Sequence, residues 1–236
     1  MRQKLSDKVR SELLGLIDGG TLAPGEPLPS ERELMERFKV GRPAIREAMQ
    51  SLETIGLIEI RHGGRARVAE PSVGRMVDQV STTMKHLLSN SPASLENLKE
   101  ARATFEREMA RIAAKRRSPT DLARLRVILA DQHDAAAETT GDPARFRTLD
   151  GLFHREIAAL SGNPIFTALI DALFRWLADF HVDLVSVPGL EQLTLAEHAQ
   201  ILAALERSDP EAAASAMSDH LLRANDLYRQ SHLPRP

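Results

Sequence analysis

The stretch Leu28–Val68 constrains the fold more than any other part of the chain, because it encodes two short helices with a break between them. Ser30 is a preferred helix N-cap, and Glu33, three residues later, completes the pattern of a capping box. Gly41 marks the end of that helix. Pro43 then opens a second helix at a first-turn position, where its missing N–H costs little. The order of these signals predicts a helix-turn-helix.

A short hairpin is predicted directly after the second helix. Gly56 ends the helix, Leu57–Ile60 is strand-like, His62–Gly64 is a turn, and Ala66–Val68 is a returning strand. A helix-turn-helix followed by such a hairpin is a winged helix-turn-helix, a module that reads DNA. A glycine at the hairpin tip lets the backbone approach DNA closely, and His62 beside it would reach the minor groove.

The second helix carries a polar stripe suited to reading bases. Arg42, Arg46 and Gln50 follow one another at intervals of four residues, so they share one helical face. An arginine in the major groove can pair bidentately with guanine O6 and N7. Arg32 and Lys39 are candidates for phosphate contacts, which position a protein without reading sequence. The alternative is a small helical domain with solvated arginines.

Composition excludes several other classes. The chain has 236 residues, a net charge of −2 and no cysteine, so disulfides and thiolate metal sites are excluded. No apolar run has the roughly 20 residues of a membrane span, and the N-terminus lacks a signal-peptide core. We therefore expect no membrane association and a cytoplasmic location. The near-neutral charge does not decide for or against DNA binding, which requires a basic face rather than a basic chain.

The rest of the chain reads as helix throughout. We place a domain boundary between residues 71 and 72, with the winged helix-turn-helix in 1–71 and an all-helical domain in 72–236. The fold class is therefore mainly α, with about six to seven helices in the second domain. The expected helices are 73–88, 95–117, 119–138, 144–161, 164–185, 190–208 and 210–231. A helical bundle of this size can enclose a ligand cavity.

Four side chains of this second domain form a candidate metal site. Asp150 and His154 are four residues apart and share a helix face. His198 and His220 lie on the last two expected helices, next to apolar inward positions. Three imidazoles and one carboxylate suit zinc, and nickel, cobalt or manganese remain open. A lone helical histidine is more often structural or solvated, so the site depends on all four converging.

At its N-terminal end the chain resembles the GntR family of transcriptional regulators. The residues that carry this resemblance are Pro29-Ser30-Glu31-Arg32-Glu33-Leu34, Val40-Gly41-Arg42-Pro43, Arg46-Glu47-Ala48 and Gly56-Leu57-Ile58. The resemblance implies that Arg32, Arg42, Arg46 and the wing pair His62 and Gly63 contact double-stranded operator DNA.

The second domain resembles the effector (FCD) domain of the FadR-type branch of that family. The matching residues are Asp150-Gly151-Leu152-Phe153-His154, Glu197-His198 and Met217-Ser218-Asp219-His220-Leu221. The resemblance implies a divalent metal, with zinc as the first choice, held by the aspartate and the three histidines. It also implies that the metal helps to hold a small carboxylate-bearing effector. A further resemblance, to sialic-acid-responsive repressors of the family, makes sialic acid or another sugar acid the candidate.

Two further residues are candidates for effector binding. Arg102 matches an arginine that faces the pocket in some members of the branch, and a guanidinium suits a bidentate carboxylate contact. The alternative is a surface arginine paired with Glu106, one turn further along the helix. Asn163 is the second candidate, although an asparagine at a helix boundary also has a local explanation.

These observations lead to one preferred function and two alternatives. The preferred function is a homodimeric DNA-binding regulator, a repressor rather than an enzyme, controlled by a small acid at a metal site. One alternative is a metal-dependent hydrolase or lyase fused to a DNA-binding domain, with Glu197 as the candidate general base. The other is a constitutive DNA binder with a purely structural metal.

Overall fold

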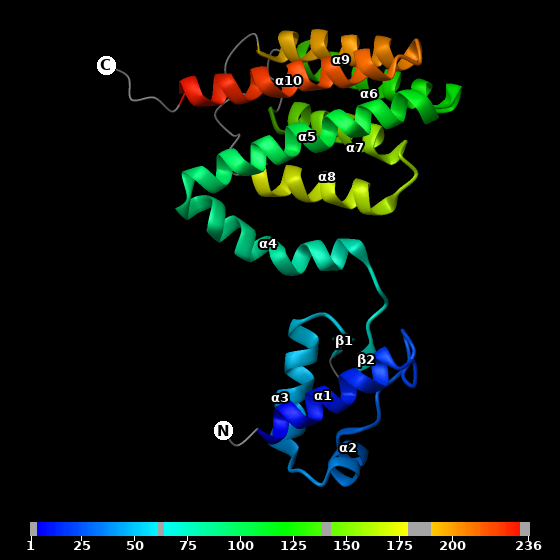
Figure 1. The fold of residues 1–236 in the computed structure, drawn as a ribbon, viewed down its shortest axis with the longest axis vertical. Coiled ribbons are helices and arrows are strands. Elements are labelled where there is room, and N and C mark those ends of the chain that lie inside the picture. Colours follow the sequence, from blue (N-terminus) through cyan, green and yellow to red (C-terminus); the bar gives the residue numbers. More distant parts are fainter. Residues whose placement is uncertain (1–3, 61–63, 138–142, 179–189, 232–236) are drawn as a thin grey trace. The chain divides into compact units, whose positions relative to one another are not determined.

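A computed structural model describes residues 4–60, 64–137, 143–178 and 190–231 (Figure 1). These residues contain ten helices and two short strands, which form two compact units, Met1–Val80 and Ser81–Pro236. The predicted class, mainly α with an N-terminal winged helix-turn-helix and a C-terminal helical bundle, is confirmed. Among the described residues, no helix combines the length and apolarity needed to span a bilayer.

The first unit is a small domain with three helices and a hairpin. Its elements are α1 (Leu5–Asp18), α2 (Glu31–Phe38), α3 (Arg42–Thr54), β1 (Ile58–Glu59) and β2 (Arg67–Val68). Both α1 and α2 pack against α3. Every element contributes at least one buried side chain to the core, and the most deeply buried include Val9, Leu13, Leu34, Ile45, Leu52 and Ile58. This single core fixes α3, so that its polar stripe faces away from it.

The predicted helix signals act as expected in the first unit. The Ser30 hydroxyl accepts a hydrogen bond from the Glu33 N–H at 3.3 Å, and the Glu33 carboxylate accepts one from the Ser30 N–H at 2.6 Å. Lys39 closes α2 in the left-handed conformation, with φ of 54°. Gly41 caps α3, and Pro43 lies in its first turn. The turn between the two helices is therefore specified locally.

The hairpin contains more structure than the sequence suggested. β1 and β2 pair antiparallel, with Ile58 opposite Val68. The segment before α2 also pairs with β2, since the Leu28 N–H donates to the Ala66 carbonyl at 2.8 Å and the Val68 N–H donates to the Glu26 carbonyl at 2.9 Å. This pairing is not among the elements expected from the sequence. The hairpin tip, residues 61–63, lies outside the described residues.

The second unit is a bundle of helices. Following α4 (Val73–Asn90), which contributes residues to both units, are α5 (Pro92–Arg116), α6 (Pro119–Ala137), α7 (Pro143–Ala159), α8 (Pro164–Leu177), α9 (Leu190–Glu206) and α10 (Pro210–Ser231). α5 packs against α10, α7 and α9, while α6 packs against α7 and α9 (Figure 1). α8 covers another side of α7. The predicted boundary between residues 71 and 72 stays a prediction.

Proline opens five of the helices in this bundle, because its fixed φ and missing N–H suit a first helical position. One predicted helix end falls outside the part of the chain that the structure describes. The sequence suggested that the helix starting at Pro164 continues to Val185, whereas α8 is described only as far as Leu177. Residues 179–189 lie outside the described residues.

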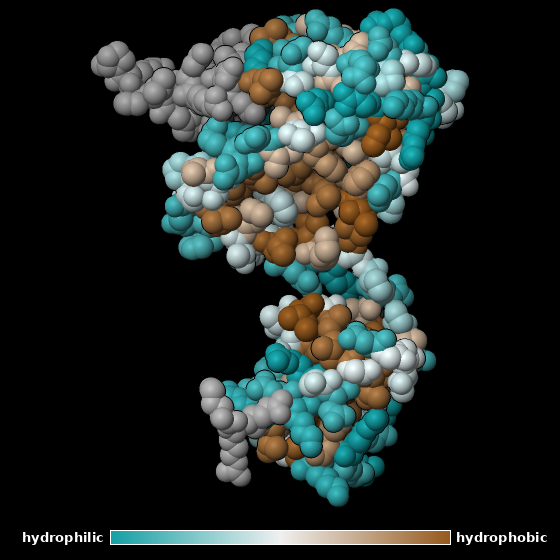
Figure 2. Space-filling model, in the orientation of Figure 1, coloured by the Kyte–Doolittle hydropathy of each residue, from teal (hydrophilic) through white to brown (hydrophobic). Residues whose placement is uncertain are grey.

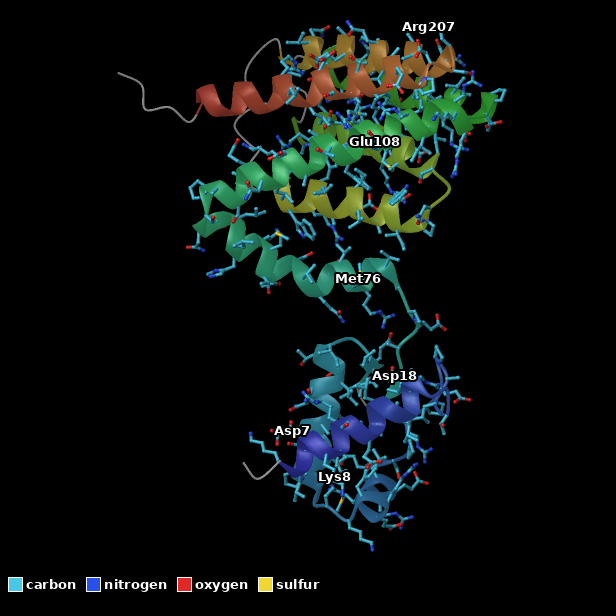
Figure 3. The ribbon with its side chains drawn as sticks, in the orientation of Figure 1. Asp7, Lys8, Asp18, Met76, Glu108 and Arg207 are labelled. Carbon is cyan, nitrogen blue, oxygen red and sulfur yellow. The ribbon has the colours of Figure 1, made fainter. Side chains whose placement is uncertain are left out.

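Arginines from the end of α5 hold the last two helices of the bundle in place. Arg111 pairs with Glu108, labelled in Figure 3, and its Nη2 lies 2.7 Å from the Glu211 carboxylate of α10. Arg117, just after α5, donates to the Leu205 and Glu206 carbonyls at the end of α9, at 2.9 Å each. These contacts tie the end of α5 to α9 and α10, the helices that carry His198 and His220.

The capping box gives a direct test of the local signals in the first unit. Replacing Ser30 with alanine removes the hydroxyl that accepts from Glu33, so we expect Ser30→Ala to lower the free energy of unfolding by about 1 kcal/mol. Chemical denaturation of the full chain measures this. Ser11→Ala, at an exposed position inside α1, is the matched control, and we expect no loss there. An equal loss in both variants would contradict the role of the cap.

Candidate metal centre and nucleic-acid interface

The structure brings together the four predicted metal ligands from three helices. Asp150 and His154 lie on α7, His198 on α9 and His220 on α10, and each offers a ligand atom within 4.8 Å of the others. The three histidines are buried, while the Asp150 side chain is 24% exposed. The His198 Nε2 atom lies 3.4 Å from the Asp150 carboxylate. The site is therefore an inward-facing cluster with one edge open to solvent.

Every histidine of the cluster has its Nδ1 atom bound by an acceptor from the surrounding helices. The pairs are His154 with the Glu106 carboxylate, His198 with the Gln132 carbonyl oxygen at 2.9 Å, and His220 with the Glu197 carboxylate at 2.7 Å. Oxygens of this kind only accept, so each Nδ1 carries a hydrogen. In a neutral imidazole the lone pair is then on Nε2. Acceptors that fix histidine tautomers in this way are a regular feature of metal sites.

Two of the three inward nitrogens make no hydrogen bond within the described part of the chain. Among the described residues, the Nε2 atoms of His154 and His198 are buried without a hydrogen bond. Leaving a buried polar atom unsatisfied costs about 1–3 kcal/mol, so a compact group of such atoms calls for an explanation. In a tetrahedral zinc site neighbouring ligand atoms lie about 3.4 Å apart, since zinc–nitrogen distances are about 2.1 Å. The distance between His198 and Asp150 matches this value, and the donor set fits a divalent cation.

Burial favours the neutral form of two of these imidazoles, those of His198 and His220. It lowers the pKa of His198 well below its ordinary value, and the neighbouring His220 and His154 lower it further. Burial also lowers the pKa of His220, although the hydrogen bond to Glu197 opposes the shift. Because a cation binds the unprotonated nitrogen, these shifts favour metal binding over proton binding near neutral pH.

Two arginines stabilise the carboxylates that orient the histidines. Arg102 donates from Nε to the Glu106 carboxylate at 2.5 Å, and Arg223 binds the Glu197 carboxylate. Burial alone would raise the pKa of Glu106, but the charges of His154 and Arg102 outweigh it and lower the pKa to about 2. Glu197, the candidate general base of the hydrolase alternative, is thus already bound by a histidine and an arginine.

The two candidate effector residues have different surroundings. Arg102 pairs with Glu106, as the structural alternative required, but it is buried, and its guanidinium carbon lies 4.3 Å from the centre of the Phe174 ring. Asn163 caps α8, since its side-chain oxygen accepts from the Ile165 N–H at 3.0 Å. That bond accounts for Asn163 locally. Effector contacts by either residue stay predictions.

Sequence reasoning missed the residues that orient the ligands. Gln132, Glu106 and Arg223 were not recognised as such, although the first two carry a signal. Gln132 continues the buried stripe Leu125, Ile128, Leu129 on α6, and Glu106 lies one turn before Ala110 on the buried side of α5. A polar residue on an otherwise apolar helix face is a sign of a buried hydrogen-bonding partner.

In the first unit, the polar stripe that is predicted to read bases is exposed on α3. Its two arginines contact the same carboxylate. Arg42 and Arg46 have side chains 61% and 64% exposed, and Gln50 is exposed on the same face. The Glu31 carboxylate at the start of α2 lies 3.3 Å from Arg42 Nε and 2.9 Å from Arg46 Nε. Glu31 therefore links the two helices of the helix-turn-helix through the guanidinium groups.

The structure describes some of the other candidate DNA-contacting residues but not all of them. The Arg32 side chain is 83% exposed, 4.0 Å from Glu36, and Lys39 is exposed in the turn. His62 and Gly63, at the tip of the hairpin, lie outside the described residues. DNA contacts by all these side chains stay predictions.

Comparison with known families identifies both units. Residues 5–68 match the model of bacterial regulatory proteins of the gntR family, and residues 97–223 match the FCD domain. The chain belongs to the GntR family of transcriptional regulators and carries an FCD domain.

Its relatives define the class more closely. The HTH-type transcriptional repressor NanR of Cronobacter sakazakii is 37% identical over 222 residues, which cover 93% of this chain and 84% of the relative. NanR of Edwardsiella tarda is 36% identical over 240 residues, covering 98% and 87%. The structure of Streptococcus agalactiae GntR aligns over 95% of this chain and 99% of its own, with a TM-score of 0.60 and 26% identity. These relatives are regulators, so the chain is a NanR-like transcriptional regulator rather than an enzyme.

The buried histidines predict how stability depends on pH. The unfolded chain protonates these side chains below about pH 6.5, whereas the lowered pKa values of His198 and His220 keep the folded chain unprotonated there. The metal-free protein should therefore be most stable above about pH 6.5 and lose up to about 1.4 kcal/mol per pH unit for each of the two histidines on acidification, until the folded-state pKa is reached. Denaturation in EDTA between about pH 7 and pH 5 measures this loss. His198→Gln should give a shallower dependence, and an equal slope would contradict the assignment.

Proposed function

We propose that the chain is a homodimeric repressor whose operator affinity is controlled by a small carboxylate-bearing effector bound at a metal ion in the C-terminal unit. The observation that carries the proposal is the convergence of His154, His198, His220 and Asp150, with each Nδ1 atom already bound and the Nε2 atoms directed inward. The NanR relatives are repressors, which supports the proposal that this regulator represses transcription.

Zinc is the metal we propose, because three imidazole nitrogens and one carboxylate oxygen are donors that it accepts readily, with nickel, cobalt and manganese as competitors. The bound cation supplies a positive charge to which an effector carboxylate binds. Arg102 is the proposed second anchor. Among the described residues, no hydrogen bond occupies the Nη groups of this buried guanidinium. A guanidinium suits a carboxylate in a site of low dielectric constant.

The proposed effector is sialic acid or another sugar acid. Its class follows from the cation and the arginine, and the choice among acids rests on the resemblance to NanR repressors. Asn163 remains a weaker candidate contact, because capping of α8 already accounts for its side chain.

On DNA, we propose that Arg42 and Arg46 read bases while Arg32 contacts phosphate, with His62 and Gly63 at the wing. A two-fold dimer would place two α3 helices about one helical turn of DNA apart. Apolar residues gather over α5 and α8 on one face of the C-terminal unit (Figure 2), and this supports association of two chains. Ile165, at the start of α8, is a large apolar side chain that is 47% exposed. A regulator of bacterial transcription acts on DNA in the cytoplasm, where we place it.

The proposed switch is a shift between two populations of the dimer. The effector binds one arrangement of the helical domains better, and the segment near Pro71 transmits the difference to the spacing of the two DNA-binding units. The size of the response is limited by the difference in effector affinity between the two arrangements.

The test is a gel-shift titration on duplex DNA that the protein selects from a randomised pool. With zinc bound, sialic acid should weaken operator binding, and after removal of zinc with a chelator it should have no effect. His198→Ala should lower zinc content and the response to sialic acid while operator binding remains. Full zinc occupancy in His198→Ala would refute the ligand set. Zinc binding without a response to any sugar acid would favour the constitutive binder.

The reading helix has its own test. Arg46→Ala should weaken binding to the selected operator by about 1–3 kcal/mol and bring its affinity closer to that for unrelated DNA. Arg32→Ala is the matched comparison. It should weaken binding to both DNAs about equally and reduce the salt dependence by about one counterion. If Arg46→Ala also weakened both DNAs equally, Arg46 would be a phosphate contact and not a base reader.

A further inference from the structure

Glu106 connects the two parts of the candidate effector site. The carboxylate is 1% exposed, and its oxygens serve different partners. Oε1 accepts from Arg102 Nε at 2.5 Å, and Oε2 lies against His154 Nδ1. A single buried side chain of α5 therefore touches both the candidate effector arginine and a candidate metal ligand on α7.

The same two partners share a second contact on α8. The Arg102 guanidinium lies over the Phe174 ring at 4.3 Å, and the His154 ring centre lies 5.3 Å from that of Phe174. Arg102, Glu106, Phe174 and His154 thus form a closed set, in which a shift of one side chain disturbs the packing of the next. The contacts of such a buried set can be worth more together than the sum of the separate pairs.

We propose that Glu106 is a positioning residue that couples metal binding to effector binding. It orients His154 so that Nε2 faces the metal, and it holds Arg102 by Nε, so that the Nη groups are left for the effector carboxylate. The inference rests on the proposed function and adds to it a residue that makes the two binding events depend on each other.

The other two histidine anchors serve as internal comparisons. Gln132 orients His198 through a neutral amide. Glu197 orients His220 and is bound by Arg223, which gives the same kind of arginine–carboxylate–histidine chain. No described contact joins Glu197 to Arg102. Loss of Glu197 should therefore affect the metal alone, whereas loss of Glu106 should affect metal and effector.

The substitution Glu106→Gln tests the coupling at nearly constant volume. The carboxylate accepts from two donors at once, the Arg102 Nε–H and the His154 Nδ1–H. A glutamine amide offers one oxygen and one NH₂ group. One of the two N–H groups must then face the NH₂ group, which is also a donor. Arg102 or His154 therefore loses its orientation.

The experiment measures zinc affinity by chelator competition and sialic acid affinity by calorimetry at saturating zinc, in the full-length wild type, Glu106→Gln and Glu197→Gln. Both variants should bind zinc about 10–100-fold more weakly. Only Glu106→Gln should also bind sialic acid more weakly at saturating zinc, by about tenfold or more. In the cobalt-substituted proteins, both variants should shift the visible absorption spectrum, which reports ligand geometry and not general stability.

Arg102→Gln provides the second variant in case Glu106→Gln fails to fold. It leaves every metal ligand in place, yet without effector it should lower zinc affinity by up to about tenfold, because Glu106 loses the group that holds it. Unchanged zinc affinity in Arg102→Gln, or equal sialic acid affinity in Glu106→Gln and Glu197→Gln, would overturn the coupling while the wild type still bound both ligands. A wild type that binds no zinc would instead refute the proposed function itself, and the inference with it.

Discussion

The C-terminal unit depends on one constraint, which is that three imidazoles are buried together and each must keep a hydrogen-bonding partner. Glu106, Gln132 and Glu197 meet that requirement on the outer side of the rings. They come from α5, α6 and α9, so the orientation of the cluster depends on the packing of most of the bundle. Because the Nδ1 atoms are used in this way, the Nε2 atoms point toward one another, an arrangement that a shared cation would satisfy.

The first unit shows a comparable arrangement at its surface, with a different purpose. The Glu31 carboxylate holds Arg42 and Arg46, the two residues that would read DNA, and all three remain partly exposed. Exposed ion pairs contribute little to stability. The main effect of Glu31 is therefore to orient the guanidinium groups of Arg42 and Arg46. In both units, charged side chains from neighbouring helices hold the candidate functional residues in position. The ion pairs on α3 are accessible to solvent, whereas those around the histidines are buried.

The sequence predicted the fold, and it singled out the four side chains that the structure brings together, because these features depend on local rules. Each helix signal depends only on residues close to it in the sequence. Examples are the capping box at Ser30, the proline at the start of most bundle helices and the periodic spacing of apolar residues. Asp150 and His154 share a face through helical spacing alone. The third strand-like segment at Pro27 was not predicted, because its hydrogen bonds go to residues near Ala66, far along the chain.

By itself, then, the sequence determined a winged helix-turn-helix joined to a helical domain, together with four candidate metal ligands. Only the tertiary structure decided which nitrogen of each histidine faces inward, that Arg102 is buried against Phe174 rather than exposed, and that Glu197 is bound by Arg223. The reason is physical: helical periodicity fixes the face on which a side chain lies, whereas the partner across that face comes from another helix, whose position depends on how the whole core packs.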